Sequence, residues 1–85
     1  MPELSRFLGI VVQMYFEDHQ PPHFHARYGE YRIKVLIESG VVEGRFPPRA
    51  LRNLLEWYDL HGAELMHDWG LVSRGEQPLP IAPLE

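Results

Sequence analysis

The sequence predicts a small α+β domain: a four-stranded antiparallel meander packed on one face by a long C-terminal amphipathic helix. Three observations carry this prediction. Residues 7–46 contain runs of β-branched, aromatic and alternating side chains separated by glycine turns, and residues 47–75 place apolar side chains at steps of three and four. Residues 76–85 are rich in proline. We therefore expect one domain over residues 1–75 and an extended proline-containing tail over residues 76–85.

The strands follow in order from the pattern of apolar runs and turns. Residues 7–16, "FLGIVVQMYF", predict a first strand, which ends at the polar, proline-containing "EDHQPP". "HFHARY" and "YRIKVLI" alternate with period two around Gly29-Glu30, a pair suited to a tight hairpin turn. Ser39-Gly40 predicts a second tight turn into the short strand "VVEGRF". The first strand is apolar on both faces, so the helix, the tail or a second copy in a homodimer should cover part of it.

The helix is predicted over the segment "PPRALRNLLEWYDLHGAELMHDWGLVSRG", which begins with a proline pair suited to a helix start. Its apolar stripe predicts one amphipathic helix, or two if Gly62 breaks it. The tail "QPLPIAPLE" is expected to lie on the domain or on a neighbour. The stripe consists of Leu51, Leu54, Leu55, Tyr58, Gly62, Leu65, Met66, Trp69 and Val72.

The two turns also predict a register. A turn at Gly29-Glu30 sets His25 opposite Lys34 and Arg27 opposite Arg32, and a turn at Ser39-Gly40 sets Lys34 opposite Arg45. Like charges in opposite positions disfavour pairing by up to about 1 kcal/mol, so this face is expected to bind a partner of negative charge. Cations that merely protect exposed strands from aggregation are the alternative. The predicted binding face is His25, Arg27, Arg32, Lys34 and Arg45, and the opposite, apolar face is Phe24, Ala26, Tyr28, Tyr31, Ile33, Val35, Ile37, Val42 and Phe46.

Three histidines lie close together in the segment "DHQPPHFH". His19, His23 and His25 are a workable set of nitrogen ligands for one zinc-like divalent metal, although the Lys34 ammonium opposite His25 counts against it. Asp18 could add an oxygen ligand. His23 and His25 also suggest a metal-independent ribonuclease, in which the two histidines exchange protons and Lys34, Arg27 or Arg32 stabilises charge on the phosphate. A purely structural role for the histidines is the third alternative.

Composition limits the classes of function. The 85 residues carry a net charge of −4, which does not favour a nucleic-acid binder overall, although residues 19–37 are locally basic. The chain has no cysteine, so disulfides and thiolate metal ligands are excluded. The N-terminal apolar run lacks a basic flank and a small-residue cleavage site. We expect a cytoplasmic protein without membrane contacts.

The segments "SRFLGIVVQMYFEDHQPPHFHARYGEY", "PPRALRNLLEWYDLH" and "PLPIAPLE" together resemble the bacterial family catalogued as domain of unknown function 4160. The resemblance implies a small stand-alone prokaryotic protein whose gene lies beside that of a second small protein, as in a toxin–antitoxin operon. It implies no tested activity. The leading hypothesis is therefore a binding module without a cofactor, one half of such a pair, whose basic face engages an acidic protein from the neighbouring gene, or RNA or DNA. Whether the protein is also an enzyme stays open.

Overall fold

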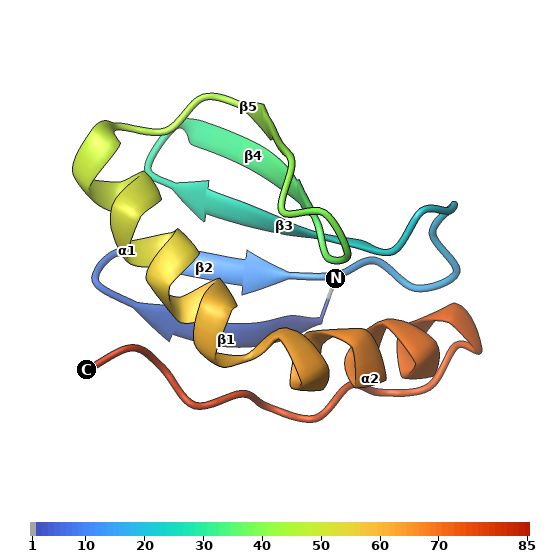
Figure 1. The fold of residues 1–85 in the computed structure, drawn as a ribbon. Coiled ribbons are helices and arrows are strands. Elements are labelled where there is room, and N and C mark those ends of the chain that lie inside the picture. The colour runs from blue at the N-terminus through green and yellow to red at the C-terminus, as the bar shows by residue number, and fades with distance from the viewer. Residues whose placement is uncertain (1) are drawn as a thin grey trace.

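The structure, a computed structural model, describes residues 2–85 and contains one antiparallel sheet and two helices. The predicted α+β class is confirmed, but the sheet has five strands where four were expected, in the order β1-β2-β3-β4-β5 (Figure 1). The elements are β1 (Glu3–Phe7), β2 (Ile10–Gln13), β3 (His23–Tyr28), β4 (Tyr31–Leu36), β5 (Val42–Gly44), α1 (Pro48–Leu60) and α2 (Gly62–Ser73).

The additional strand arises because the predicted first strand is a hairpin. Leu8 and Gly9 both have positive φ, 49° and 82°, so they form a tight turn that pairs Phe7 with Ile10. The sequence pattern missed this turn because leucine rarely adopts a positive φ. The prediction of one strand over residues 7–16 is therefore wrong: β1 begins at Glu3, and residues 14–22 form a loop.

The register is confirmed for one predicted hairpin and wrong for the other. β3 and β4 pair as expected, with His25 opposite Lys34 and Arg27 opposite Arg32. Between β4 and β5, however, Lys34 lies opposite Glu43, because residues 37–40 form a longer loop in place of the tight turn. The Leu36 N–H donates to the Val41 carbonyl at 2.9 Å and closes this loop. The shift moves Arg45 beyond the end of β5.

Two helices replace the single long one, and α1 crosses in front of the sheet in Figure 1. The break lies at His61, next to the glycine that the sequence marked as a breaker. Because the helices have different axes, one stripe does not run through both. Leu51, Leu55 and Tyr58 are only partly buried. The buried residues are Ala50, Leu54 and Trp57 on α1 and Leu65, Asp68, Trp69 and Val72 on α2.

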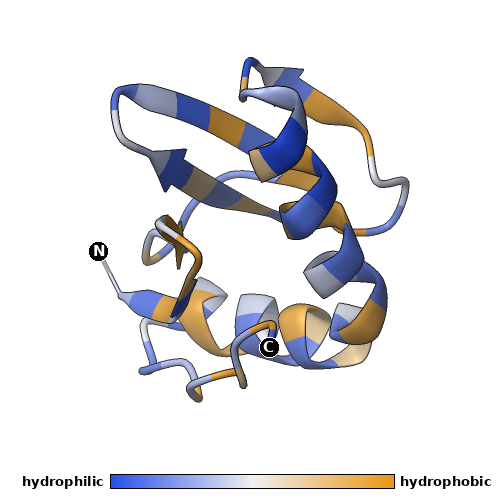
Figure 2. Ribbon diagram, turned by 90° about the vertical axis from the view of Figure 1, so that its left-hand side faces the viewer, coloured by the Kyte–Doolittle hydropathy of each residue, from blue (hydrophilic) through white to orange (hydrophobic). Residues whose placement is uncertain are grey.

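The hydrophobic core lies between the sheet and the helices. Phe24, Ala26, Ile33 and Val35 are buried on the sheet face predicted to be apolar, and Trp57 packs against Phe24 with ring centroids 6.0 Å apart. Alternating orange and blue segments along the strands display this two-faced pattern in Figure 2. Three alternate apolar side chains, two on β2 and one at the start of the loop that follows it, are also buried within the chain. No second subunit is needed to cover them. They are Ile10, Val12 and Met14.

Residues 76–85 contain no helix or strand but lie against the domain (Figure 1). The Ile81 N–H donates to the Leu4 carbonyl at 2.8 Å, and the Ile81 side chain is buried. The Trp57 indole N–H donates to the Ala82 carbonyl at 2.8 Å. The tail is therefore attached to both β1 and α1. Within residues 2–85, neither helix has the length and apolar character needed to cross a membrane.

Candidate functional site

The loop of residues 14–22 and the start of β3 bring Asp18, His23 and His25 together. His23 and His25 are two residues apart on one strand, so their side chains lie on the same face. The backbone places Asp18 above them, because the Glu17 N–H donates to the Val72 carbonyl at 2.9 Å and ties the loop to the end of α2. One Asp18 oxygen, Oδ2, lies 2.9 Å from His23 Nε2 and 3.6 Å from His25 Nε2.

His23 is fully enclosed and has a partner on each ring nitrogen. Its side chain is 1% exposed, and its ring packs 5.0 Å from the Trp69 ring of α2. Nδ1 lies 2.8 Å from the Pro21 carbonyl oxygen, while Nε2 faces Asp18. A carbonyl oxygen only accepts hydrogen bonds, so Nδ1 carries a proton and the ring orientation is set.

His25 lies at the border between this cluster and solvent. Its side chain is 27% exposed, and the Tyr15 ring packs edge-on against it with centroids 4.5 Å apart. Burial lowers the pKa of His25, and the nearby His23 and Lys34 lower it further against the opposing effect of Asp18. The neutral imidazole is therefore favoured. Its Nε2 is buried and has no hydrogen-bond partner among the residues that the structure describes.

The Asp18 carboxyl group is held as a carboxylate. Burial by itself raises its pKa, but the hydrogen bond from the His19 backbone N–H and the close contact with His23 outweigh burial, so the pKa is lowered overall. The backbone bond, from His19 N–H to Asp18 Oδ1, is 2.8 Å long. The cluster thus presents one anionic oxygen to two imidazole nitrogens.

The other predicted site residues lie around this cluster. His19, a predicted metal ligand, is 74% exposed at its side chain, and its Nε2 is 3.7 Å from Asp18 Oδ1. The three side chains whose donor atoms all lie within 4.8 Å of one another are Asp18, His23 and His25. Asp18, which the sequence offered only as an additional oxygen, takes the place expected of His19. Lys34 is turned toward Glu43, with Nζ 3.7 Å from Oε1.

The sheet face opposite α1, here called the open face, carries two rows of side chains. The first row crosses from β1 to β4 as Arg6, Val11, Arg27 and Arg32, each directly opposite the next. We call Arg6, Arg27 and Arg32 the arginine row. Arg6 is paired with Glu3 at 2.8 Å, whereas Arg27 and Arg32 form no salt bridge within residues 2–85.

The second row of the open face crosses from β2 to β5 as Gln13, His25, Lys34 and Glu43. The predicted cationic row of His25, Lys34 and Arg45 is therefore wrong, because the longer loop of residues 37–40 brings Glu43 opposite Lys34. Sequence reasoning also missed Arg6. Recognition of Leu8-Gly9 as a turn would have placed Arg6 beside Val11 and in line with Arg27.

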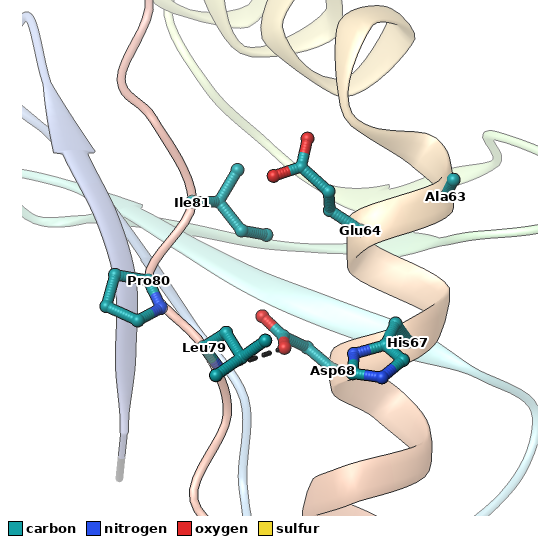
Figure 3. A pocket seen from close by; sticks show the side chains of 7 residues that line it. All are labelled: Ala63, Glu64, His67, Asp68, Leu79, Pro80 and Ile81. Carbon is teal, nitrogen blue, oxygen red and sulfur yellow. Dashed lines mark hydrogen bonds between the residues drawn. The ribbon is translucent and has the colours of Figure 1, made fainter.

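A cavity of about 270 Å³ lies elsewhere, between α2 and the tail (Figure 3). Asp68 forms part of its wall, and its Oδ1 accepts the Leu79 N–H at 2.9 Å. Burial raises the pKa of Asp68 despite that hydrogen bond. We assign the Asp68 carboxyl group to fixing the tail. The cavity is lined by Ala63, Glu64, His67, Asp68, Leu79, Pro80 and Ile81, so none of the clustered side chains of Asp18, His23 and His25 reaches it.

Comparison with known proteins places the chain in a family but supplies no activity. Neither the curated proteins nor the solved structures gave a significant match. A family model described as a domain of unknown function (DUF4160) matches residues 9–70, a segment that includes β2 to β5, α1 and the Asp18, His23 and His25 cluster. Since this match covers most of the chain, the protein belongs to the DUF4160 family.

Proposed function

We propose that this protein is a small prokaryotic binding module that recognises an acidic protein through the open face, as one member of a toxin–antitoxin-like pair in the cytoplasm. The observation that carries the proposal is the arginine row, in which Arg27 and Arg32 lie directly opposite each other on adjacent strands. Like charges in this position disfavour strand pairing, and an acidic partner relieves that cost.

The distribution of charge supports the same proposal. The chain has a net charge of −4, yet Arg6, Arg27, Arg32 and Lys34, half of its eight Lys and Arg residues, project from the open face. Glu3 and Glu43 neutralise two of these cations. The unpaired positive charge of the open face is therefore that of Arg27 and Arg32, whereas the ten Asp and Glu residues other than Glu3 and Glu43, of twelve in the chain, lie outside its two rows.

An acidic protein segment fits this face better than a nucleic acid. Nucleic-acid affinity grows with the number of phosphates that cations neutralise, and the two unpaired arginines of the open face, on a protein of net negative charge, neutralise few. An extended acidic segment needs only a few carboxylates, each of which an arginine guanidinium binds with two parallel hydrogen bonds. We therefore place RNA and DNA second among the expected partners.

The geometry gives less support to a metal-independent ribonuclease. Such an enzyme needs His23 and His25 to exchange protons with a bound substrate, together with a free cation such as Lys34. Lys34 is paired with Glu43, so Arg27 and Arg32 are the cations left to contact a phosphate. His23 is 1% exposed and both its ring nitrogens already face protein oxygens. That leaves only His25 accessible for acid–base chemistry.

The test is binding of a fluorescein-labelled glutamate-rich peptide, measured by anisotropy in the presence of EDTA, with single-stranded RNA of the same length as the competing probe. We expect the peptide to bind more tightly than the RNA. We also expect the R27E/R32E variant to lose more than about tenfold in peptide affinity, because like charges then meet at the interface. Co-expression with the product of the adjacent gene extends the test to a complex of full chains.

The matched control is R49E/R52E, which makes the same change of charge at two exposed arginines on α1. This variant should bind the peptide nearly as well as the wild-type protein does. Equal losses in both double variants would show that net charge alone attracts the peptide, which contradicts a specific face. Tighter binding of RNA than of peptide would replace the acidic protein by a nucleic acid as partner.

A further inference from the structure

We propose that Asp18, His23 and His25 form a binding site for one divalent transition-metal ion such as Zn²⁺. This site contains no residue of the arginine row, so the metal proposal and the proposed function can be tested separately. Two imidazole nitrogens and one carboxylate oxygen are ligands that Zn²⁺ commonly takes in proteins. The site differs from the three-histidine set that the sequence predicted, because Asp18 replaces His19.

The contact between His23 and Asp18 requires a cation. Nδ1 of His23 carries the proton that it donates to the Pro21 carbonyl oxygen, 2.8 Å away. In the neutral ring, Nε2 then presents a lone pair to Asp18 Oδ2 at a distance of 2.9 Å. Two lone pairs at this distance repel each other, so a second ring proton or a metal ion must lie between them.

His25 distinguishes between these two cations. A proton on His23 Nε2 satisfies only the contact with Asp18. His25 Nε2 would remain buried without a hydrogen-bond partner, although it points at the same oxygen from 3.6 Å. An unpaired buried nitrogen costs about 1–3 kcal/mol. A metal ion shared by the three side chains removes this cost as well, and it therefore accounts for all three orientations.

The distances match those of a coordinated ion. Zinc lies about 2.0–2.2 Å from nitrogen and oxygen ligands, which sets neighbouring ligands of a tetrahedral ion roughly 3.3–3.5 Å apart. The two contacts to Asp18 Oδ2, 2.9 Å and 3.6 Å, lie close to this spacing on either side. These two distances need to change by only about half an ångström, and all three donor atoms lie within 4.8 Å of one another. A tetrahedral ion would keep one position for water or for an atom of a partner.

The surroundings hold the site in place. The hydrogen bond from His23 Nδ1 to a backbone carbonyl is the outer contact that metal-binding histidines usually make. Trp69 packs against His23, and Tyr15 packs against His25. The Lys34 ammonium, which counted against a metal in the sequence, is paired with Glu43, so part of its charge is neutralised before an ion binds.

The experiment is isothermal titration calorimetry, in which Zn²⁺ is added to the untagged protein after treatment with EDTA and removal of the EDTA. The zinc content of the zinc-loaded protein is then measured by elemental analysis after dialysis. We expect one Zn²⁺ per chain. The D18N and H25A variants should bind more than about 100-fold more weakly, since loss of an outer contact alone already costs 10–100-fold. The D18N variant keeps the shape of the side chain, so it tests the site even if H25A folds poorly. Far-UV circular dichroism verifies the fold of each variant.

The matched controls are H19A and H67A, which remove exposed histidines outside the three-residue set. Both should retain wild-type affinity and stoichiometry. Wild-type protein that retains no zinc after dialysis, or D18N that binds as tightly as the wild type, overturns the proposal. Loss of binding in H19A overturns the assigned ligands in favour of the three-histidine set. Since the peptide assay contains EDTA, none of these results depends on the arginine row.

Discussion

Gly44 lies opposite Ile33, next to the pair of Lys34 and Glu43, and its replacement by alanine is the sharpest test of how closely β5 approaches β4. Gly44 has a φ of +109°, where an L side chain is strained. A Cβ atom there would lie 2.6 Å from the Arg32 carbonyl oxygen and 3.1 Å from Ile33 Cα. Both are backbone atoms of β4, so they cannot turn aside as the end of a flexible side chain does.

The expected cost combines two effects. Backbone strain of this kind costs about 1–3 kcal/mol, and overpacking against rigid atoms adds about 1–3 kcal/mol. G44A should therefore unfold with a free energy lower by about 2–6 kcal/mol, a large share of the roughly 5–15 kcal/mol typical of a domain. At about 4–8 °C per kcal/mol for a domain of this size, the melting temperature should fall by at least about 8 °C.

The assay is urea and thermal denaturation followed by tryptophan fluorescence and circular dichroism, with G29A as the control. Gly29 also has a positive φ, +58°, but nothing lies within 4 Å of the position that a Cβ atom would take there. G29A therefore reports the backbone strain alone, and G44A should be less stable than G29A by about 1–3 kcal/mol. Equal stability of the two variants would refute the close approach of β5 to β4, and with it the pairing of Lys34 with Glu43.

Three further predictions concern the helices and the tail. Y58F should lower the free energy of unfolding by about 1 kcal/mol in urea denaturation, because the Tyr58 hydroxyl donates to the Ile37 carbonyl at 2.6 Å. I81A should lower it by about 2–5 kcal/mol, since the Ile81 side chain is 4% exposed; a change near zero would mean that the tail is detached. Burial raises the pKa of Asp68 above 3.8, so the folded state binds this proton more tightly, and stability falls as the pH rises from 3.8 through the raised pKa. The melting temperature of D68N relative to wild type should therefore increase from about pH 4 to about pH 7, and a constant difference would contradict this.

Local sequence alone determined the central hairpin. Period-two alternation around Gly29-Glu30 gave the pairing of His25 with Lys34 and of Arg27 with Arg32, because a tight turn sets the register of both its strands. It also identified the apolar sheet face and the grouping of His23 with His25. These features depend on neighbours within a few residues along the chain, for which the sequence carries a direct signal.

Only the tertiary structure decided which groups meet across larger separations. The turn at Leu8-Gly9 requires a leucine with positive φ. The loop of residues 37–40 sets Glu43 opposite Lys34 in place of Arg45. Asp18 reaches His23 because α2 holds the preceding residue through the Val72 carbonyl. The two hairpin loops depend on a strained leucine and on a loop length that turn preferences do not specify, and the Asp18 contact depends on how α2 packs against the loop.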